Sequence, residues 1–232
     1  MPLIISVTGA HSSCGKTTLC ELILDRIKKK WGAIKYTKTA FYTSVSDEKQ
    51  SDPEGKDTQR MLHAGATKVI WLQSPREGLS EAVPMALGML SDFNFLISEG
   101  NSLIEFLNPD IVIFVFGKDI DRVKPTARAV LNKADFIVYN GDKSIGLYNG
   151  KRLYSLLIDE EKEEFLNRVM ERIEEVSLQK AAERLKKVAK DGRISCAVAR
   201  RIAEELNLGY KEVGELANRE GIKIKDCELG CF

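Results

Sequence analysis

The sequence predicts an α/β domain with a mostly parallel sheet, followed by a small helical domain. Short apolar runs rich in β-branched residues alternate with segments of helical periodicity along residues 1–177. The clearest run, at 111–116 (IVIFVF), is apolar throughout, as in a strand that is buried on both faces. Residues 178–232 instead show three short helical segments, so we expect the domain boundary between residues 177 and 178.

The composition is that of a soluble globular protein. Hydrophobic residues make up 44% of the 232 residues, charged residues make up 30%, and the net charge of +1 argues against a strongly basic nucleic-acid binder. We see no signal peptide and no apolar run of membrane-spanning length, so we expect a cytoplasmic protein that does not contact a membrane. The five irregularly spaced cysteines suit reduced thiols better than a disulfide framework.

The first strand and helix enclose a phosphate-binding motif. Residues 10–17 (AHSSCGKT) have Walker A spacing, with Ala10 in place of the first glycine and Gly9 one residue upstream. The apolar run 3–7 precedes the motif and an amphipathic helix follows it, which is the context that the motif requires. Backbone N–H groups and the positive helix end then form an anion site. The residues expected to contact a bound nucleotide here are Gly9, Ala10, Ser12, Ser13, Cys14, Gly15, Lys16, Thr17 and Thr18.

The later elements follow in order. The run 32–38 predicts a second strand, the polar stretch 41–55 a mobile loop, and 56–66 a short helix that stops at Gly65. Strand, helix and strand are then expected at 68–73, 79–90 and 93–100, the last ending in an acid. After the buried run come a helix at 123–133, a strand at 135–139, a hairpin at 147–157 with an Asn-Gly turn, and an amphipathic helix at 160–176. The helices of the second domain are expected at 181–189, 196–206 and 211–219.

Charged residues at strand ends complete the predicted site. Glu99 ends an apolar strand where a Walker B acid would lie, so we expect Lys16 and Glu99 to be the catalytic pair, with Thr17, Glu99 and Asp57 around Mg²⁺. Lys35 and Lys38 end the second strand, where parallel sheets bind ligands. They could neutralise phosphates or an anionic substrate, or be solvated surface lysines.

Two segments bear on base selection. Residues 132–135 (NKAD) spell the Asn-Lys-x-Asp guanine motif, but they precede a strand and therefore belong at the opposite edge of the sheet. Asn140 and Asp142 follow a strand instead, and the Asp142 carboxylate could accept hydrogen bonds from guanine N1 and N2. This pair is one residue closer than in the motif, and it favours guanine over adenine.

Three pieces of the chain resemble the MobB-like family of P-loop proteins (molybdopterin-guanine dinucleotide biosynthesis protein B). They are the loop at 9–19, the segment 55–66 (GKDTQRMLHAGA) and the strand end at 97–100 (ISEG). The resemblance covers about half of the chain. It implies a P-loop NTPase three-layer sandwich and a homodimer that binds GTP and hydrolyses it weakly. Lys16 and Thr17 would bind phosphate and Mg²⁺, and Glu99 would be the Walker B-like acid.

The resemblance also implies a role in attaching a guanosine nucleotide to molybdopterin, through molybdopterin itself or the nucleotidyltransferase that performs the transfer. The chain departs from the family at Tyr36-Thr37-Lys38, where histidine and aspartate usually follow the lysine. From Asp121 onward it looks more like related dimeric P-loop GTPases. An ATP-dependent ligase or kinase resembling dethiobiotin synthetases, in which Lys16 and Lys35 stabilise the transferred phosphoryl group, is therefore an alternative.

The second domain has two further interpretations. Its helices around residues 207–209 have helix–turn–helix proportions, which makes a nucleotide-sensing DNA-binding regulator an alternative. The segment 211–220 carries a net charge of −1, however, and this disfavours DNA as a partner. Cys196, Cys227 and Cys231 could bind zinc or an iron–sulfur cluster, but a closed zinc site needs a fourth ligand, so small buried thiols are favoured.

Overall fold

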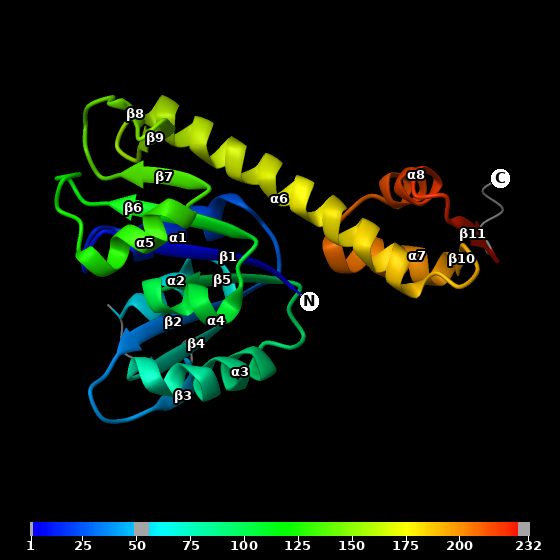
Figure 1. The fold of residues 1–232 in the computed structure, drawn as a ribbon, viewed down its shortest axis with the longest axis horizontal. Coiled ribbons are helices and arrows are strands. Elements are labelled where there is room, and N and C mark those ends of the chain that lie inside the picture. The colour runs from blue at the N-terminus through cyan, green and yellow to red at the C-terminus, as the bar shows by residue number, and fades with distance from the viewer. Residues whose placement is uncertain (1, 49–55, 227–232) are drawn as a thin grey trace. The chain divides into compact units, whose positions relative to one another are not determined.

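The computed structural model describes residues 2–48 and 56–226 and divides the chain into two units, Met1–Val169 and Met170–Phe232 (Figure 1). Helix α6 (Asp159–Val188) runs through this division. Its first part belongs to the first unit, where Phe165 packs against the ring of Phe136. Its last part supplies core residues of the second unit. The boundary expected after residue 177 also falls within this helix.

The first unit is built on a parallel sheet. In the described residues the sheet has nine strands in the order β3-β4-β2-β5-β1-β6-β7-β9-β8, and its antiparallel pairs are the outermost ones, β3 with β4 and β8 with β9. The strands are β1 (Leu3–Gly9), β2 (Trp31–Lys38), β3 (Ser44–Glu48), β4 (Ala66–Ser74), β5 (Phe95–Glu99), β6 (Ile111–Phe116), β7 (Phe136–Tyr139), β8 (Gly146–Tyr148) and β9 (Lys151–Ser155).

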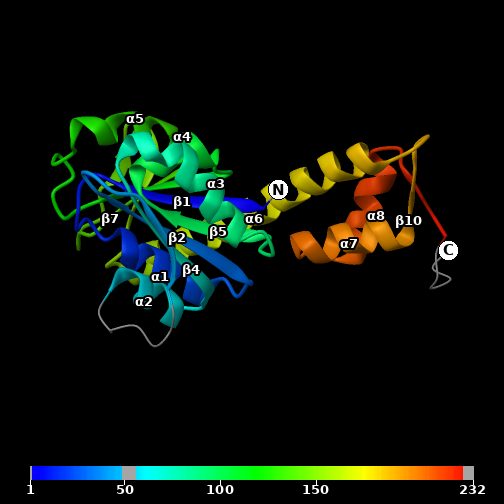
Figure 2. The same ribbon diagram turned by 90° about the horizontal axis from the view of Figure 1, so that it is seen from below.

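Helices cover both faces of this sheet and give the predicted three-layer sandwich. Figure 2 shows α3, α4 and α5 on one face and α1 and α2 on the other. These helices and the 3₁₀ turns are α1 (Lys16–Arg26), α2 (Asp57–His63), η1 (Arg76–Gly78), α3 (Leu79–Met89), η2 (Asn101–Leu103), α4 (Ile104–Leu107) and α5 (Pro125–Lys133). Because β1 is buried along its whole length between β5 and β6, the loop that follows it lies at the centre of the sheet edge.

One strand of the first unit was not predicted from the sequence, and neither were β10 (Arg193–Ser195) and β11 (Lys223–Lys225) of the second unit. Residues 41–55 were expected to form a loop, but 44–48 form β3, which pairs antiparallel with β4; residues 49–55 lie outside the described part of the chain. Its sequence, SVSDE, is polar and mostly half-buried, so no apolar alternation reveals it. Backbone pairing at the sheet edge stabilises it instead. The predicted hairpin is confirmed, with Asn149 and Gly150 at φ +48° and +76°, as a type I′ turn requires.

The second unit has its own apolar core. Helices α7 (Cys196–Leu206) and α8 (Tyr210–Arg219) pack with the end of α6 and with a two-stranded parallel sheet of β10 (Arg193–Ser195) and β11 (Lys223–Lys225). The separate helix expected at 181–189 is wrong, because α6 continues to Val188. Residues 177–180 contain neither glycine nor proline, so nothing in the sequence stops the helix there. The described helices include none that is both long and apolar enough to span a bilayer.

Candidate functional site

The phosphate loop leaves β1 at Gly9 and enters α1 at Lys16. A Cβ atom on Gly9 would lie 2.3 Å from the Cys14 sulfur and 3.0 Å from the Val115 carbonyl oxygen, so a side chain here would force Cys14 to move. Ala10 is fully buried, and its backbone N–H donates to the Val115 carbonyl oxygen at 2.9 Å. The close approach that Walker A loops need is therefore made at Gly9, while the methyl group of Ala10 joins the apolar core.

The other end of the loop is fixed by a glycine and an asparagine. Gly15 has φ +100°, and a Cβ atom there would lie 2.0 Å from the Nδ2 atom of Asn140. That Nδ2 atom donates to the Cys14 carbonyl oxygen at 2.5 Å. Asn140 follows β7, so a second strand end supports the loop directly before α1.

Lys16 lies over its own loop. Its ammonium group donates to the His11 carbonyl oxygen at 2.9 Å and lies 3.8 Å from the Cys14 sulfur. Both acceptors are uncharged: a backbone carbonyl oxygen and a buried sulfur. Charged phosphate oxygens would bind the ammonium group more strongly, so Lys16 is placed to exchange these contacts for a nucleotide.

Polar side chains from three elements converge beside Thr17. The Thr17 hydroxyl donates to Glu99 Oε2 at 2.8 Å, and the Lys35 ammonium group donates to Glu99 Oε1 at 2.5 Å. The same ammonium group lies 2.6 Å from Asp57 Oδ2. Sheet register produces this arrangement, because Glu99 of β5 is paired with Val7 of β1 and with Lys35 of β2.

Burial strengthens the attraction between Lys35 and Glu99 in this cluster. Only 3% of the Glu99 side chain and 12% of the Lys35 side chain are exposed. Burial by itself would lower the pKa of Lys35, but the attraction of Glu99 and the hydrogen bonds with both carboxylates raise it. Burial likewise opposes ionisation of Asp57, yet the hydrogen bond from Lys35 lowers its pKa. Both partners are therefore charged near neutral pH.

Arg60 attaches α2 to the start of α1. Its guanidinium group donates to both carboxylate oxygens of Glu21, at 2.8 and 2.5 Å, and to the Thr18 hydroxyl at 3.0 Å. Arg60 and Asp57 lie one turn apart on α2. The position of Asp57 beside Lys35 thus depends on a helix that is anchored at the phosphate loop.

These side chains surround one cavity of about 600 Å³ at the carboxyl edge of the sheet. Its lining residues are Ser12, Ser13, Gly15, Lys16, Thr17, Thr18, Lys35, Tyr36, Thr37, Lys38, Asp57, Arg60 and Glu99. The cavity brings together most of the residues expected from the sequence, including Lys38. Mg²⁺ usually takes one or two carboxylates, waters and substrate phosphates as ligands. The Thr17 hydroxyl and the two carboxylates of this cavity fit that requirement.

The first unit also matches a known family. Residues 4–101 match the family model described as Molybdopterin guanine dinucleotide synthesis protein B (MobB). The predicted resemblance is confirmed over this MobB segment (residues 4–101). The segment contains the phosphate loop, Lys35, Asp57 and Glu99, so all the charged groups of the cavity cluster belong to it.

Other comparisons gave distant similarities. No curated protein matches the chain. A structure of LpxK from Aquifex aeolicus in complex with ATP is 18% identical, with a TM-score of 0.46, over 66% of this chain and 53% of that one. This chain thus spans about half the length of that protein. A structure of HypB from Helicobacter pylori in complex with nickel is 15% identical, with a TM-score of 0.39, over 74% of this chain and 86% of that one.

The MobB segment ends at a residue that the sequence analysis missed. Asn101 Oδ1 accepts the Gly9 N–H at 2.8 Å, and Asn101 Nδ2 donates to the Gly9 carbonyl oxygen at 2.9 Å. Gly100, at φ +144°, turns the chain directly after Glu99 and packs against Tyr36. The sequence does contain a signal for Asn101: an amide side chain comes directly after the Glu-Gly pair that ends β5, and β5 lies next to β1, which leads into the phosphate loop.

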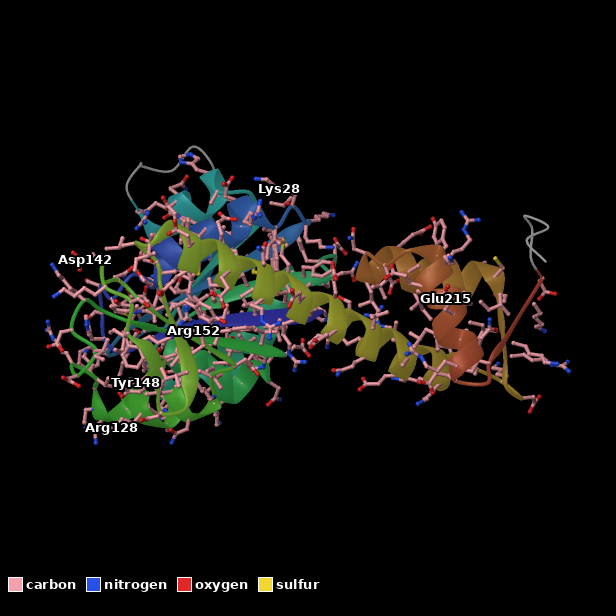
Figure 3. All side chains as sticks on the ribbon, turned by 90° about the horizontal axis from the view of Figure 1, so that it is seen from above. Lys28, Arg128, Asp142, Tyr148, Arg152 and Glu215 are labelled. Carbon is pink, nitrogen blue, oxygen red and sulfur yellow. The ribbon has the colours of Figure 1, made fainter. Side chains whose placement is uncertain are left out.

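Asn140 and Asp142, the expected base-binding pair, lie outside the MobB segment and do not converge on one site. Asn140 contacts the phosphate loop, but neither Asn140 nor Asp142 lines the cavity. Asp142 is exposed, and Figure 3 shows it at the periphery of the first unit. Residues 132–135 (NKAD) were expected at the opposite edge of the sheet, and the structure places them there: the Asp135 carboxylate accepts the backbone N–H of Val112 at the start of β6. That is the edge opposite the cavity.

The expected thiolate site is only partly covered by the structure. Cys196 begins α7 in the second unit and is half-buried. Cys227 and Cys231 lie outside the described residues. The described residues contain no group of three or more histidine, cysteine, aspartate or glutamate side chains that could hold a metal ion.

Proposed function

We propose that this chain is a Mg²⁺-dependent GTP-binding protein that assists molybdenum-cofactor biosynthesis and hydrolyses GTP slowly. The observation that carries the proposal is the hydrogen bond between Thr17 and Glu99 beside Lys16, within a segment that matches the MobB family. In P-loop proteins the hydroxyl at this position ligates Mg²⁺ and the acid holds or orients its ligands. The cavity therefore has the groups that a bound triphosphate requires.

The chain's own groups would divide the work as follows. Loop N–H groups and Lys16 bind the phosphates, and Thr17 with Glu99 and Asp57 would hold Mg²⁺, which supplies charge neutralisation at the phosphates. Glu99 is the candidate for orienting the attacking water. Both of its carboxylate oxygens already accept hydrogen bonds, from Thr17 and Lys35, so an attacking water would have to compete with these donors. This supports slow hydrolysis.

The guanine preference and the partner are further parts of the proposal. For the guanine preference, the support is that Asn140 follows a strand end beside the phosphate loop, which it contacts at Cys14. Asp142 lies two residues further on in the same segment and would move to read the base. We propose a cytoplasmic homodimer whose partner is molybdopterin or the nucleotidyltransferase that attaches the guanosine nucleotide.

Calorimetric titration with GTP, GDP and ATP, each with and without Mg²⁺, tests the proposal. We expect GTP to bind more tightly than ATP, and Mg²⁺ to strengthen GTP binding. Lys16→Ala should abolish binding, whereas Lys28→Ala should leave it unchanged, because Lys28 is exposed beyond the far end of α1 (Figure 3). Absence of GTP binding to the unmodified chain would refute the proposal, and tighter binding of ATP would refute its base preference.

A second candidate function is ATP-dependent phosphoryl transfer to an anionic acceptor. The cavity continues beyond the phosphate loop to Thr37 and Lys38, and Lys38 forms no ion pair with any other described residue. An unpaired ammonium group at that position could hold a carboxylate or phosphate acceptor. Tighter binding of ATP than GTP, together with a phosphorylated product detected by phosphorus NMR, would favour this function.

A further inference from the structure

One lysine stands between the two carboxylates of the cavity. The Lys35 ammonium group is 2.5 Å from Glu99 Oε1 and 2.6 Å from Asp57 Oδ2. It joins two elements that are remote in sequence, since Glu99 ends β5 and Asp57 begins α2. The carboxylates that would serve Mg²⁺ therefore already share a cation that belongs to the protein.

This arrangement is unfavourable for a free divalent cation. A hard cation such as Mg²⁺ or Mn²⁺ needs about six oxygen ligands, and the cluster around Lys35 offers only the carboxylates of Glu99 and Asp57 and the neighbouring Thr17 hydroxyl. A cation that approached Glu99 and Asp57 would also meet the positive charge of Lys35 at close range. Few ligands and a resident ammonium group act together against metal binding.

A bound triphosphate changes both conditions. Its oxygens add ligands for the metal, and its negative charge offers Lys35 a new partner in the same cavity, because Lys35 and Lys16 both line it. Asp57 is the partner that Lys35 can release more easily, since 44% of the Asp57 side chain is exposed, compared with 3% for Glu99.

We propose that Lys35 is an internal counter-ion that excludes free divalent cations from the cavity, so that metal and triphosphate bind together. The inference rests on the proposed function, because it takes this cavity to be a metal–nucleotide site. Lys35 is then a positioning residue that sets the order of binding. By linkage, the nucleotide strengthens metal binding by the same factor as the metal strengthens nucleotide binding.

Titration with Mn²⁺ alone, with free Mn²⁺ measured by electron paramagnetic resonance, tests the role of Lys35. We expect Lys35→Met to bind Mn²⁺ at least tenfold more tightly than the unmodified chain, and Lys35→Arg to bind it no more tightly. Lys38→Met removes an equal charge from the same cavity without contacting either carboxylate, so its Mn²⁺ affinity should change far less. Equal affinities for Lys35→Met and the unmodified chain would overturn the proposal, as would an equal gain in Lys38→Met.

Lys35→Met leaves Glu99 buried without its counter-ion, which could destabilise the fold. A second measurement, the melting temperature with and without Mn²⁺, therefore tests the proposal in a destabilised variant as well. Added Mn²⁺ should raise the melting temperature of this variant more than that of the unmodified chain. The additional change Asp57→Asn should remove most of that gain. A Lys35→Met variant that Mn²⁺ does not stabilise, or that stays unfolded with and without Mn²⁺, also overturns the proposal.

The two proposals fail in different experiments. Loss of the Mn²⁺ contrast, with GTP still bound by the unmodified chain, overturns only the role of Lys35. Absence of GTP binding to the unmodified chain refutes the proposed function whatever Mn²⁺ does.

Discussion

The contact between Asn101 and Gly9 permits a quantitative prediction. The Asn101 amide makes two hydrogen bonds with the backbone of Gly9, at 2.8 and 2.9 Å, and Gly9 is buried. Asn101→Ala removes both bonds and leaves a buried N–H and a buried carbonyl oxygen without these partners. It introduces no clash, so lost hydrogen bonding should dominate its effect.

The magnitude follows from the number of bonds. Leaving a buried donor or acceptor unsatisfied costs about 1–3 kcal/mol, and with both groups near the lower end of this range we expect a loss of about 2–3 kcal/mol. For a chain of this size 1 kcal/mol corresponds to about 2–4 °C in melting temperature, and the first unit should therefore melt about 4–12 °C lower. GTP affinity should fall as well, because the first residue of the phosphate loop is no longer fixed.

Tryptophan fluorescence is a suitable assay, because the two tryptophans of the chain, Trp31 and Trp71, both lie in the first unit. Asn132→Ala is the matched control, since Asn132 is exposed on α5. It should shift the melting temperature by less than about 2 °C. An Asn101→Ala variant that melts together with this control would refute the reasoning.

Three further predictions concern the same unit. Gly15→Ala should abolish GTP binding measured by calorimetry, because the new Cβ atom would lie 2.0 Å from Asn140 Nδ2 and the residue has a left-handed φ. The double variant Gly15→Ala with Asn140→Ala should regain binding only in part, since the φ strain remains. Unchanged affinity in Gly15→Ala would contradict this account. Burial opposes ionisation of Asp57, but the hydrogen bond from Lys35 lowers the pKa of its carboxyl below the ordinary value of 3.8. The Lys35–Asp57 ion pair therefore stabilises the fold fully above pH 3.8. This stabilisation is lost as the pH falls through the lowered pKa of Asp57. Fluorescence-detected unfolding should therefore show Asp57→Asn less stable than the unmodified chain near neutral pH and converging with it in acid, and a difference that persists at the lowest pH would count against the ion pair. Burial raises the pKa of Cys20 well above 9.0, so iodoacetamide should label Cys20 only after unfolding, as followed by mass spectrometry of its peptide; rapid labelling of the native chain would show that Cys20 is accessible.

The sequence was sufficient for the phosphate loop because that signal is local. Strand, loop and helix are contiguous, and the spacing from Gly9 to Thr17 fixes which backbone groups face an anion. Glu99 could be predicted for a similar reason, since an acid at the end of an apolar strand must lie at the carboxyl edge of a parallel sheet. In both cases a short sequence pattern is enough to place the residue at the carboxyl edge of the sheet, because the topology of parallel sheets fixes that edge.

The partners of these residues could not be predicted, because they depend on register between distant strands. Lys35 was placed at the mouth of the sheet, but its contact with Glu99 joins residues 64 positions apart. Asn140 was expected to read a base, and its amide instead reaches the Cys14 carbonyl oxygen, 126 positions away. Nothing local to either residue distinguishes a ligand contact from a contact with the protein itself.

The described geometry divides the cavity into two halves with different physical character. Two asparagine amides, from Asn101 and Asn140, hold the phosphate loop at Gly9 and at Cys14, so contacts within the protein fix both ends of the loop. The other half consists of charges that neutralise one another, Lys35 with Glu99 and Asp57, and each of them could exchange its partner for phosphate or metal. An anion site fixed by contacts within the protein, beside a self-neutralised charge cluster, favours a ligand that brings both an anion and a cation. A triphosphate with its divalent metal is such a ligand, and neither component alone satisfies both halves.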